Sequence, residues 1–146
     1  MDDLIRKENI QVGVDVASWQ DAVRSVGSLL LQAGSITNQY IEEMIQAVVE
    51  LGPYMVLMPG FALAHAAPSA AVLRDDISLI TLKTPVAFGN AENDPVKVVL
   101  CICCKDRESH RTTLQRVALS VMEDGMIDKM AEAESVDSLL ALLQNA

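Results

Sequence analysis

Two apolar segments in the middle of the chain constrain its fold most strongly. Residues 77–81 and 96–104 are rich in β-branched side chains and are nearly continuously apolar. Strands that are covered on both faces have this composition, whereas a strand with one wet face alternates apolar with polar residues. A polar turn over residues 90–95 separates the two segments. The pattern predicts a sheet that is buried on both sides, so other parts of the chain must cover it.

The N-terminal part of the chain predicts one strand followed by two helices. Residues 10–14 form a short strand-like run. An apolar stripe at helical spacing covers residues 18–34, and it opens with a serine followed three positions later by an acidic residue, as in a capping box. A second stripe covers residues 37–52 and ends at a Gly-Pro pair. Both helices are suited to pack on a sheet.

The rest of the chain predicts strands and then three helices. Residues 55–58 and 61–64 are short apolar runs around a Pro-Gly pair, which indicates two strand pieces or a hairpin. From Glu108 onward the period is helical, with a break at Gly125 and a serine cap before the last helix. This order predicts one α/β domain over residues 1–146, in which helices flank a central mixed sheet on both faces.

Charge and hydropathy exclude several classes of function. The chain has 20 acidic and 11 basic residues and a formal net charge of −9, whereas a nucleic-acid-binding protein needs a basic face. The apolar stretches are too short to span a bilayer, and the charged N-terminal sequence lacks the apolar core of a signal peptide. We therefore expect a cytoplasmic protein with no direct membrane insertion. Phosphate-binding glycine loops and nucleophile elbows are absent from the sequence.

The three cysteines predict core packing rather than redox chemistry. Cys101 and Cys104 have Cys-x-x-Cys spacing, but they lie in a strand-like run, where residues three apart point to opposite faces. We expect free cysteines that act as small core residues. No second Cys or His pair stands at ligand spacing, so no metal site is expected. The pair Asp75-Asp76 is expected to form a turn.

His65 is the first candidate for chemistry, because the chain has only two histidines and imidazole can act as a nucleophile. It follows the strand-like run 61–64, which predicts a place at a strand end, where α/β sheets position their sites. Small neighbours leave room around the ring, and nearby prolines stiffen the backbone. On the residues alone, a histidine that merely packs beside the core is somewhat favoured.

His110 is the second candidate. It begins a stripe at helical spacing that continues through Leu114, Val117 and Val121, so its ring should face inward from the first helical turn. A helix N-terminus offers unpaired N–H groups and a dipole that favours an anion. The ring could donate to an anion beside His65, or it could simply contact the sheet.

Several segments together resemble a known family. They are Gly52-Pro-Tyr54, Pro59-Gly-Phe-Ala-Leu-Ala-His65, residues 79–89, residues 93–96 and the helix that carries His110. In this order they resemble the EIIA domains of the bacterial sugar phosphotransferase system (PTS), of the mannitol/fructose superfamily. The closest pattern is the ascorbate (SgaA-like) branch, in which Gly-Pro-Tyr precedes Pro-Gly-x-Ala-x-x-His.

The resemblance implies a mannitol-type EIIA fold and a phosphotransferase component. Such a domain accepts a phosphoryl group from phospho-HPr on a histidine. It passes the group to a cysteine of its cognate EIIB, which phosphorylates the sugar during import through EIIC. The phosphorylated histidine falls on His65, and the histidine that steadies the phosphoryl group falls on His110. The relay needs no cofactor or metal, because the phosphoryl group arrives already activated.

The resemblance also gives expectations about the surroundings of His65. The family usually has proline before the active histidine, and Ala64 in its place should loosen the local backbone. The mannitol branch has an arginine on the preceding helix, and its absence around Ala47-Val48 favours the ascorbate branch. Backbone N–H groups of residues 61–66 are candidate donors to the phosphoryl group. Three apolar side chains would offer partners a docking surface if they are exposed: Met58, Phe61 and Leu63.

Two alternative functions remain compatible with the sequence. One is a regulatory or binding module of the same fold, in which His65 is vestigial or serves as a phosphorylation-dependent switch. The other is a small-molecule-binding domain with a pocket at residues 59–65. Phosphate acceptance from phospho-HPr, followed by transfer to EIIB, would separate a carrier from both.

Overall fold

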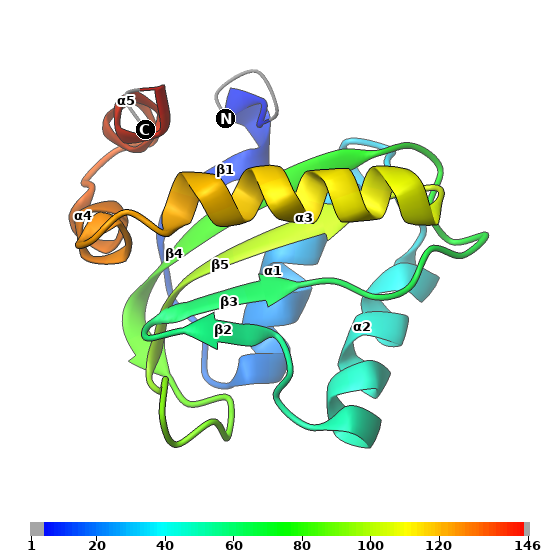
Figure 1. Cartoon of the computed structure of the whole chain (residues 1–146), viewed down its shortest axis with the longest axis horizontal. Helices are drawn as coiled ribbons and strands as arrows, with labels where there is room; N and C mark the ends of the chain where they lie inside the picture. The colour runs from blue at the N-terminus through cyan, green and yellow to red at the C-terminus, as the bar shows by residue number, and fades with distance from the viewer. Residues whose placement is uncertain (1–4, 145–146) are drawn as a thin grey trace.

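The computed structural model describes residues 5–144 and forms a sheet between two layers of helices (Figure 1). Within these residues a short 3-10 helix (Lys7–Asn9) precedes the first strand. The strands are β1 (Ile10–Val14), β2 (Val56–Met58), β3 (Phe61–Ala64), β4 (Asp76–Val86) and β5 (Val96–Cys103). The α-helices are α1 (Trp19–Gln32), α2 (Asn38–Leu51), α3 (Arg107–Val121), α4 (Met126–Glu132) and α5 (Val136–Gln144). The predicted order of elements is confirmed.

The sheet is mixed, with the strand order β1-β4-β5-β3-β2. The outer pair β1–β4 and the pair β3–β5 are parallel, while β4–β5 and β2–β3 are antiparallel. The β2–β3 pair is the hairpin that the two short apolar runs predicted. The parallel pairing of β3 with β5 is the feature that matters most for the site, because it brings the carboxyl ends of both strands to one edge.

Each face of the sheet has its own apolar core. Side chains alternate along β5, so Val99, Cys101 and Cys103 pack with α1 and α2, while Val98, Leu100 and Ile102 pack under α3, α4 and α5. Figure 1 shows α3 crossing one face, with α1 and α2 behind the strands. A strand covered in this way has no wet face, which explains the continuous apolar run that the sequence shows.

The helix boundaries follow the signals seen in the sequence. Ser18 caps α1 by accepting a hydrogen bond from the backbone N–H of Asp21 at 3.2 Å. The Asp21 carboxylate accepts from the backbone N–H of Ala17, so the reciprocal bond of the capping box is shifted by one residue. Before α5, the hydroxyl of Ser135 accepts from the backbone N–H of Ser138 at 3.0 Å. Both caps were predicted from the sequence.

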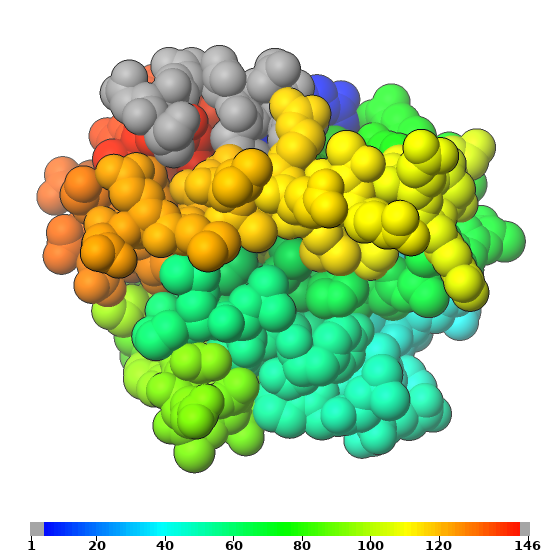
Figure 2. All heavy atoms as spheres, viewed as in Figure 1, coloured from blue at the N-terminus to red at the C-terminus, as the bar shows by residue number. Residues whose placement is uncertain are grey.

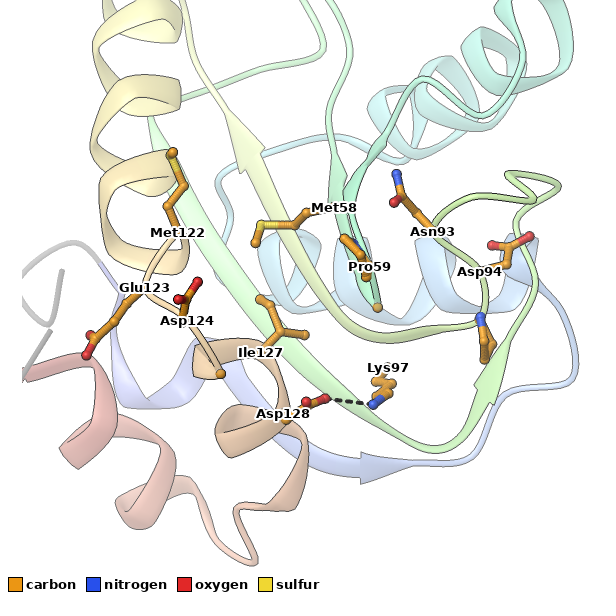
Figure 3. Close-up of a pocket in the computed structure, with 13 residues that line it drawn as sticks. Met58, Pro59, Asn93, Asp94, Lys97, Met122, Glu123, Asp124, Ile127 and Asp128 are labelled. Atoms are coloured by element: carbon orange, nitrogen blue, oxygen red, sulfur yellow. Dashed lines mark hydrogen bonds and ion pairs between the residues drawn. The ribbon is translucent and has the colours of Figure 1, made fainter.

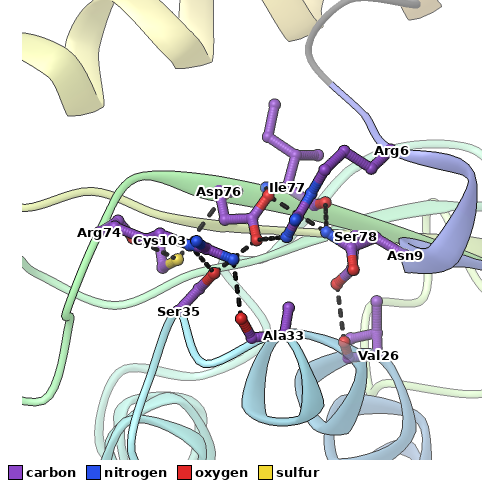
Figure 4. Close-up of polar contacts among 10 residues, drawn as sticks. All are labelled: Arg6, Asn9, Val26, Ala33, Ser35, Arg74, Asp76, Ile77, Ser78 and Cys103. Atoms are coloured by element: carbon purple, nitrogen blue, oxygen red, sulfur yellow. Dashed lines mark hydrogen bonds and ion pairs between the residues drawn. The ribbon is translucent and has the colours of Figure 1, made fainter.

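The cysteine prediction is confirmed, because Cys101, Cys103 and Cys104 are free and buried. The turn predicted at Asp75-Asp76 is wrong for Asp76, which is the first residue of β4. Its carboxylate is nearly buried and accepts hydrogen bonds from the Arg6 guanidinium, at 2.8 Å, and from the Ser35 hydroxyl (Figure 4). A carboxylate with such partners is stable at a strand start, so a charged pair there does not require a turn.

Candidate functional site

His65 lies directly after β3, at the end of the sheet where the carboxyl termini of β3 and β5 meet. All four β3 residues are buried, and the last pair that β3 forms with β5 joins Ala64 to Cys101. The chain leaves the ladder at that point, so the next side chain stands at the strand's carboxyl end. His65 is partly exposed, whereas Ala64 and Ala66 on either side of it are buried. The structure therefore presents the imidazole at the surface on a buried, well-packed strand.

His110 reaches the same edge from the neighbouring strand. After β5 ends at Cys103, Asp106 caps α3 by accepting from the backbone N–H of Ser109 at 2.8 Å. His110 stands in the first turn of this helix. Because β3 and β5 are parallel neighbours, the two chain segments that follow them emerge side by side. The ring centroids of His65 and His110 lie 5.6 Å apart, so the two histidines predicted from the sequence do come together.

The hydrogen bond of His65 fixes which ring nitrogen is free. Nδ1 lies 2.7 Å from the carbonyl oxygen of Leu63. A carbonyl can only accept, so in the neutral ring Nδ1 carries the hydrogen and Nε2 carries the lone pair. Burial lowers the pKa of His65 below its ordinary value of 6.5; the Leu63 carbonyl opposes this shift and the neighbouring His110 adds to it. The ring is therefore neutral and nucleophilic at neutral pH.

His110 has an unpaired polar atom that faces no solvent. Its Nδ1 is buried and, among the described residues, has no hydrogen-bond partner. Burial also lowers the pKa of His110 below 6.5, so this ring too is neutral at neutral pH. A buried ring nitrogen without a partner is rare in proteins. The site as it stands thus has unused hydrogen-bonding capacity next to His65.

Two tyrosine hydroxyls hold the backbone around His65. The Tyr54 hydroxyl donates to the His65 carbonyl at 2.7 Å, and its ring meets the imidazole edge-on with centroids 5.1 Å apart. The Tyr40 hydroxyl, which is buried, accepts from the backbone N–H of Ala66 at 3.0 Å. Neither tyrosine was singled out from the sequence. Tyr54 lies in the Gly-Pro-Tyr segment, which was the available signal, whereas Tyr40 falls within the predicted second helix and carries no signal of its own.

The expectation about backbone donors is wrong for two of the residues named. The N–H of Leu63 is bonded to the Met55 carbonyl at 2.8 Å, and the N–H of Ala66 is bonded to Tyr40. Both N–H groups already donate hydrogen bonds that hold β3 and the residues after it in place, so they are not free to donate to a ligand. Ala64, which replaces the family proline, remains inside β3.

An apolar groove of about 680 Å³ runs from His65 between the β2–β3 hairpin and α3. Figure 2 shows α3, in yellow, above the hairpin, in teal, on the same face of the molecule. Phe61 and Leu63 line the floor of the groove and are buried, so they are not the exposed docking residues that the sequence suggested. The exposed apolar side chains of the groove are Leu57, at 52%, and Met122, at 65%.

A second hollow, of about 500 Å³, lies where the β2–β3 turn approaches the start of α4 (Figure 3). Three of its charged side chains have partners: Lys97 bonds Asp128 at 2.7 Å, and the Asp94 carboxylate accepts from the backbone N–H groups of Phe88 and Gly89. In the part of the chain that the structure describes, no cluster of three or more His, Cys, Asp or Glu side chains could hold a metal ion. Among the described residues, the side chains best placed for chemistry are therefore His65 and His110.

None of the helices within residues 5–144 combines the length and the apolar character that crossing a membrane requires.

Comparisons with known proteins identify the family of this chain. Residues 3–146 match the family model of the phosphoenolpyruvate-dependent sugar phosphotransferase system, EIIA 2. SgcA of Escherichia coli (strain K12), named as a phosphotransferase IIA component, is 33% identical over 134 residues, which are 92% of this chain and 94% of SgcA. The ascorbate-specific PTS system EIIA component of Shigella boydii is 32% identical over 123 residues, which are 84% of this chain and 80% of that protein.

A solved structure extends the comparison to the fold. The Escherichia coli complex of enzyme IIAMTL with phosphorylated enzyme IIBMTL contains a chain that matches with a TM-score of 0.85 and 25% identity, over 97% of this chain and 98% of that one. The predicted mannitol-type EIIA fold is confirmed. The family match covers nearly the whole chain, and EIIA components are relay proteins of a phosphotransferase system. This chain therefore belongs to the EIIA 2 family of the phosphoenolpyruvate-dependent sugar phosphotransferase system.

Proposed function

We propose that residues 1–146 act as one phosphocarrier domain in the cytoplasm. In this proposal His65 accepts a phosphoryl group from phospho-HPr and passes it to the cysteine of a cognate EIIB, which serves sugar uptake through EIIC. The sugar is of the ascorbate or pentitol type, a choice supported by the ascorbate-specific relatives and by the missing arginine near Ala47. The observation that carries the proposal is the hydrogen bond from His65 Nδ1 to Leu63, which leaves Nε2 free.

The chemistry is two displacements at phosphorus. In the first, the Nε2 lone pair of His65 attacks the phosphorus, the bond between phosphorus and the donor breaks, and the electron pair of that bond stays with HPr. In the second, the EIIB thiolate attacks the same phosphorus, the bond to Nε2 breaks, and its electron pair returns to the imidazole. An imidazole nitrogen serves both steps because it is a nucleophile and a good leaving group. No nucleotide is consumed in either step.

His110 is the group best placed to steady the transferring phosphoryl group. The rate of such a transfer depends on positioning and on hydrogen-bond donors around a charged, in-line transition state. The ring of His110 stands 5.6 Å from that of His65, centroid to centroid, and its buried Nδ1 is unpaired in the described chain. A phosphoryl group on Nε2 would bring strong acceptors into this space and would give His110 a partner.

The decisive experiment is phosphate acceptance by His65→Ala. Wild-type protein incubated with phosphoenolpyruvate, Enzyme I and HPr should acquire acid-labile, base-stable label, whereas His65→Ala should remain unlabelled because it lacks the nucleophile. Circular dichroism should show that the variant is folded, since His65 is partly exposed and the hydrogen bond that its side chain would lose is the one to Leu63. His110→Ala is the matched control, because it removes the other imidazole and should still accept label.

A chase onto purified EIIB completes the test. Label that moves from the wild type to an EIIB cysteine supports the carrier role. Label that stays on His65 would point instead to a phosphorylation-dependent regulatory module. Labelling of His65→Ala to the wild-type extent would contradict the assignment of the acceptor.

A further inference from the structure

Tyr54 contacts both the backbone and the ring of His65. It stands in the loop between the end of α2 at Leu51 and the start of β2 at Val56. Its hydroxyl donates to the His65 carbonyl at 2.7 Å. Its half-buried ring meets the imidazole at an interplanar angle of 85°, which is the edge-to-face arrangement that aromatic rings favour. One side chain therefore restrains the main chain and the ring plane of the same residue.

This restraint acts where the sheet can no longer supply one. The ladder between β3 and β5 ends at Ala64, so the peptide that follows His65 lies beyond the strand pairing. The bond from Nδ1 to the Leu63 carbonyl spans two residues, and it survives only while the backbone from 63 to 65 keeps its shape. A rotation about the N–Cα bond of His65 would move its carbonyl and its imidazole together, and it would turn the ring away from Leu63 and release the preference for hydrogen on Nδ1.

We propose that Tyr54 is a positioning residue for phosphoryl transfer, which keeps His65 in the tautomer and ring orientation that present the Nε2 lone pair to an incoming phosphoryl group. The inference rests on the carrier role proposed above and adds a residue to it. Tyr54 does not touch the phosphorus; it acts through His65. Small errors of orientation slow a transfer strongly, because the reacting atoms must lie in line.

The two tyrosines at the site differ in a way that supports this role. The Tyr40 hydroxyl is buried, and its hydrogen bonds join it to the backbone groups of Ala66 and Ile102. Tyr54 is half-buried, faces the groove and touches the reactive ring. The geometry is what a side chain that orients a nucleophile requires, whereas the contacts of Tyr40 are those of a core support.

The test uses Tyr54→Phe and Tyr54→Leu. Tyr54→Phe keeps the ring contact and removes the hydrogen bond, and Tyr54→Leu removes both. The matched control is Ser78→Ala, which removes another hydroxyl that donates to a backbone carbonyl at 2.7 Å, in this case that of Val26 in α1. Ser78 lies in β4, which β5 separates from β3. Two readouts are needed: single-turnover acceptance from phospho-HPr over a range of donor concentrations, and the nitrogen-15 shifts of the unphosphorylated His65 ring, which report its tautomer.

For Tyr54→Phe we expect the limiting rate constant of acceptance to fall about 3- to 10-fold, the range that one hydrogen bond supports, with the half-saturating concentration of phospho-HPr unchanged. Its nitrogen-15 shifts should move from the pattern of hydrogen on Nδ1 toward an averaged pattern. The rate for Tyr54→Leu should fall further, by a factor of about 10² at most. Ser78→Ala should keep the wild-type rate and the wild-type shifts, because it lies two strands from β3.

The outcomes separate this inference from the carrier role itself. If the wild type accepts label and Tyr54→Phe matches it in rate and in ring shifts, the inference is overturned and the carrier role stands. An equal loss of rate in Ser78→Ala would also overturn it, because the effect would then be one of general stability. If the wild type takes no label, the carrier role fails, and the nitrogen-15 shifts alone decide whether Tyr54 fixes the tautomer.

Discussion

Tyr40→Phe tests how the residues that follow β3 are held in place. The Tyr40 side chain is fully buried, and its hydroxyl accepts from the Ala66 N–H at 3.0 Å and lies 2.9 Å from the Ile102 carbonyl. Phenylalanine fills nearly the same volume, so the change creates little cavity and mainly removes the hydroxyl. It leaves a buried backbone donor and a buried backbone acceptor without this partner. The cost therefore measures hydrogen bonding rather than packing.

The magnitude follows from the two groups left behind. A buried polar group that loses its partner destabilises a protein by about 1–3 kcal/mol. The Ile102 carbonyl can keep other bonds because oxygen has two lone pairs, whereas the Ala66 N–H has a single hydrogen to place. We expect a loss of about 2–4 kcal/mol in the free energy of unfolding. For a domain of this size that corresponds to a decrease in Tm of about 5–15 °C.

The assay is urea unfolding followed by circular dichroism, supported by a thermal scan. Tyr54→Phe serves as the control, because it removes a hydroxyl that is only half-buried and should cost less than about 1.5 kcal/mol. A loss below about 1 kcal/mol for Tyr40→Phe would refute the reasoning, since water or another group would then satisfy Ala66. An unchanged m-value is required for the comparison, because it shows that the same surface unfolds.

Two further predictions concern the histidines. His110→Ala should still accept label but should transfer it to EIIB about 10²- to 10³-fold more slowly, as expected for the loss of one transition-state donor; a wild-type rate in the EIIB chase would remove His110 from the mechanism. The proton signals of the His65 and His110 rings should titrate with midpoints below 6.5, because burial lowers both pKa values. Acceptance should then be insensitive to pH near neutrality and should fall as the pH is lowered through the His65 midpoint, because a protonated ring has no lone pair. The unfolded chain binds these protons more readily, so the free energy of unfolding should also decrease as the pH is lowered through this window. Midpoints above 6.5 in the NMR titration would contradict both statements.

The fold was predictable from the sequence because its signals are local. Apolar runs, helical stripes and caps such as Ser18 depend on neighbouring residues, and the structure places all of them as expected. Asp76 was misjudged because its partners are distant in the chain: Arg6 precedes β1, and Ser35 lies between α1 and α2. A charged pair looks like a turn when such partners are not known. Long-range contacts therefore determine that Asp76 begins a strand.

The site was only half predictable for the same reason. His65 and His110 stood out as the only histidines, and the resemblance linked them, but their separation depends on the parallel pairing of β3 and β5. The burial of Phe61 depends on the core that it shares with α3, α4 and α5, so a local apolar run did not reveal whether it was exposed. The positions of Tyr40 and Tyr54 could not be inferred, because their hydroxyls bond to residues on other elements.

The hydrogen bond between His65 and Leu63 has a consequence for the order of events in catalysis. One ring nitrogen is committed to the Leu63 carbonyl, so the imidazole offers a single point of attack. A phosphoryl donor and a phosphoryl acceptor that both use this point cannot occupy it together. In the proposed carrier role, transfer through His65 would then follow double-displacement kinetics, in which the phosphorylated protein is an obligatory, separable intermediate. Unphosphorylated HPr in excess would compete with EIIB for that intermediate, and the supply of sugar would in turn govern how long the domain stays charged.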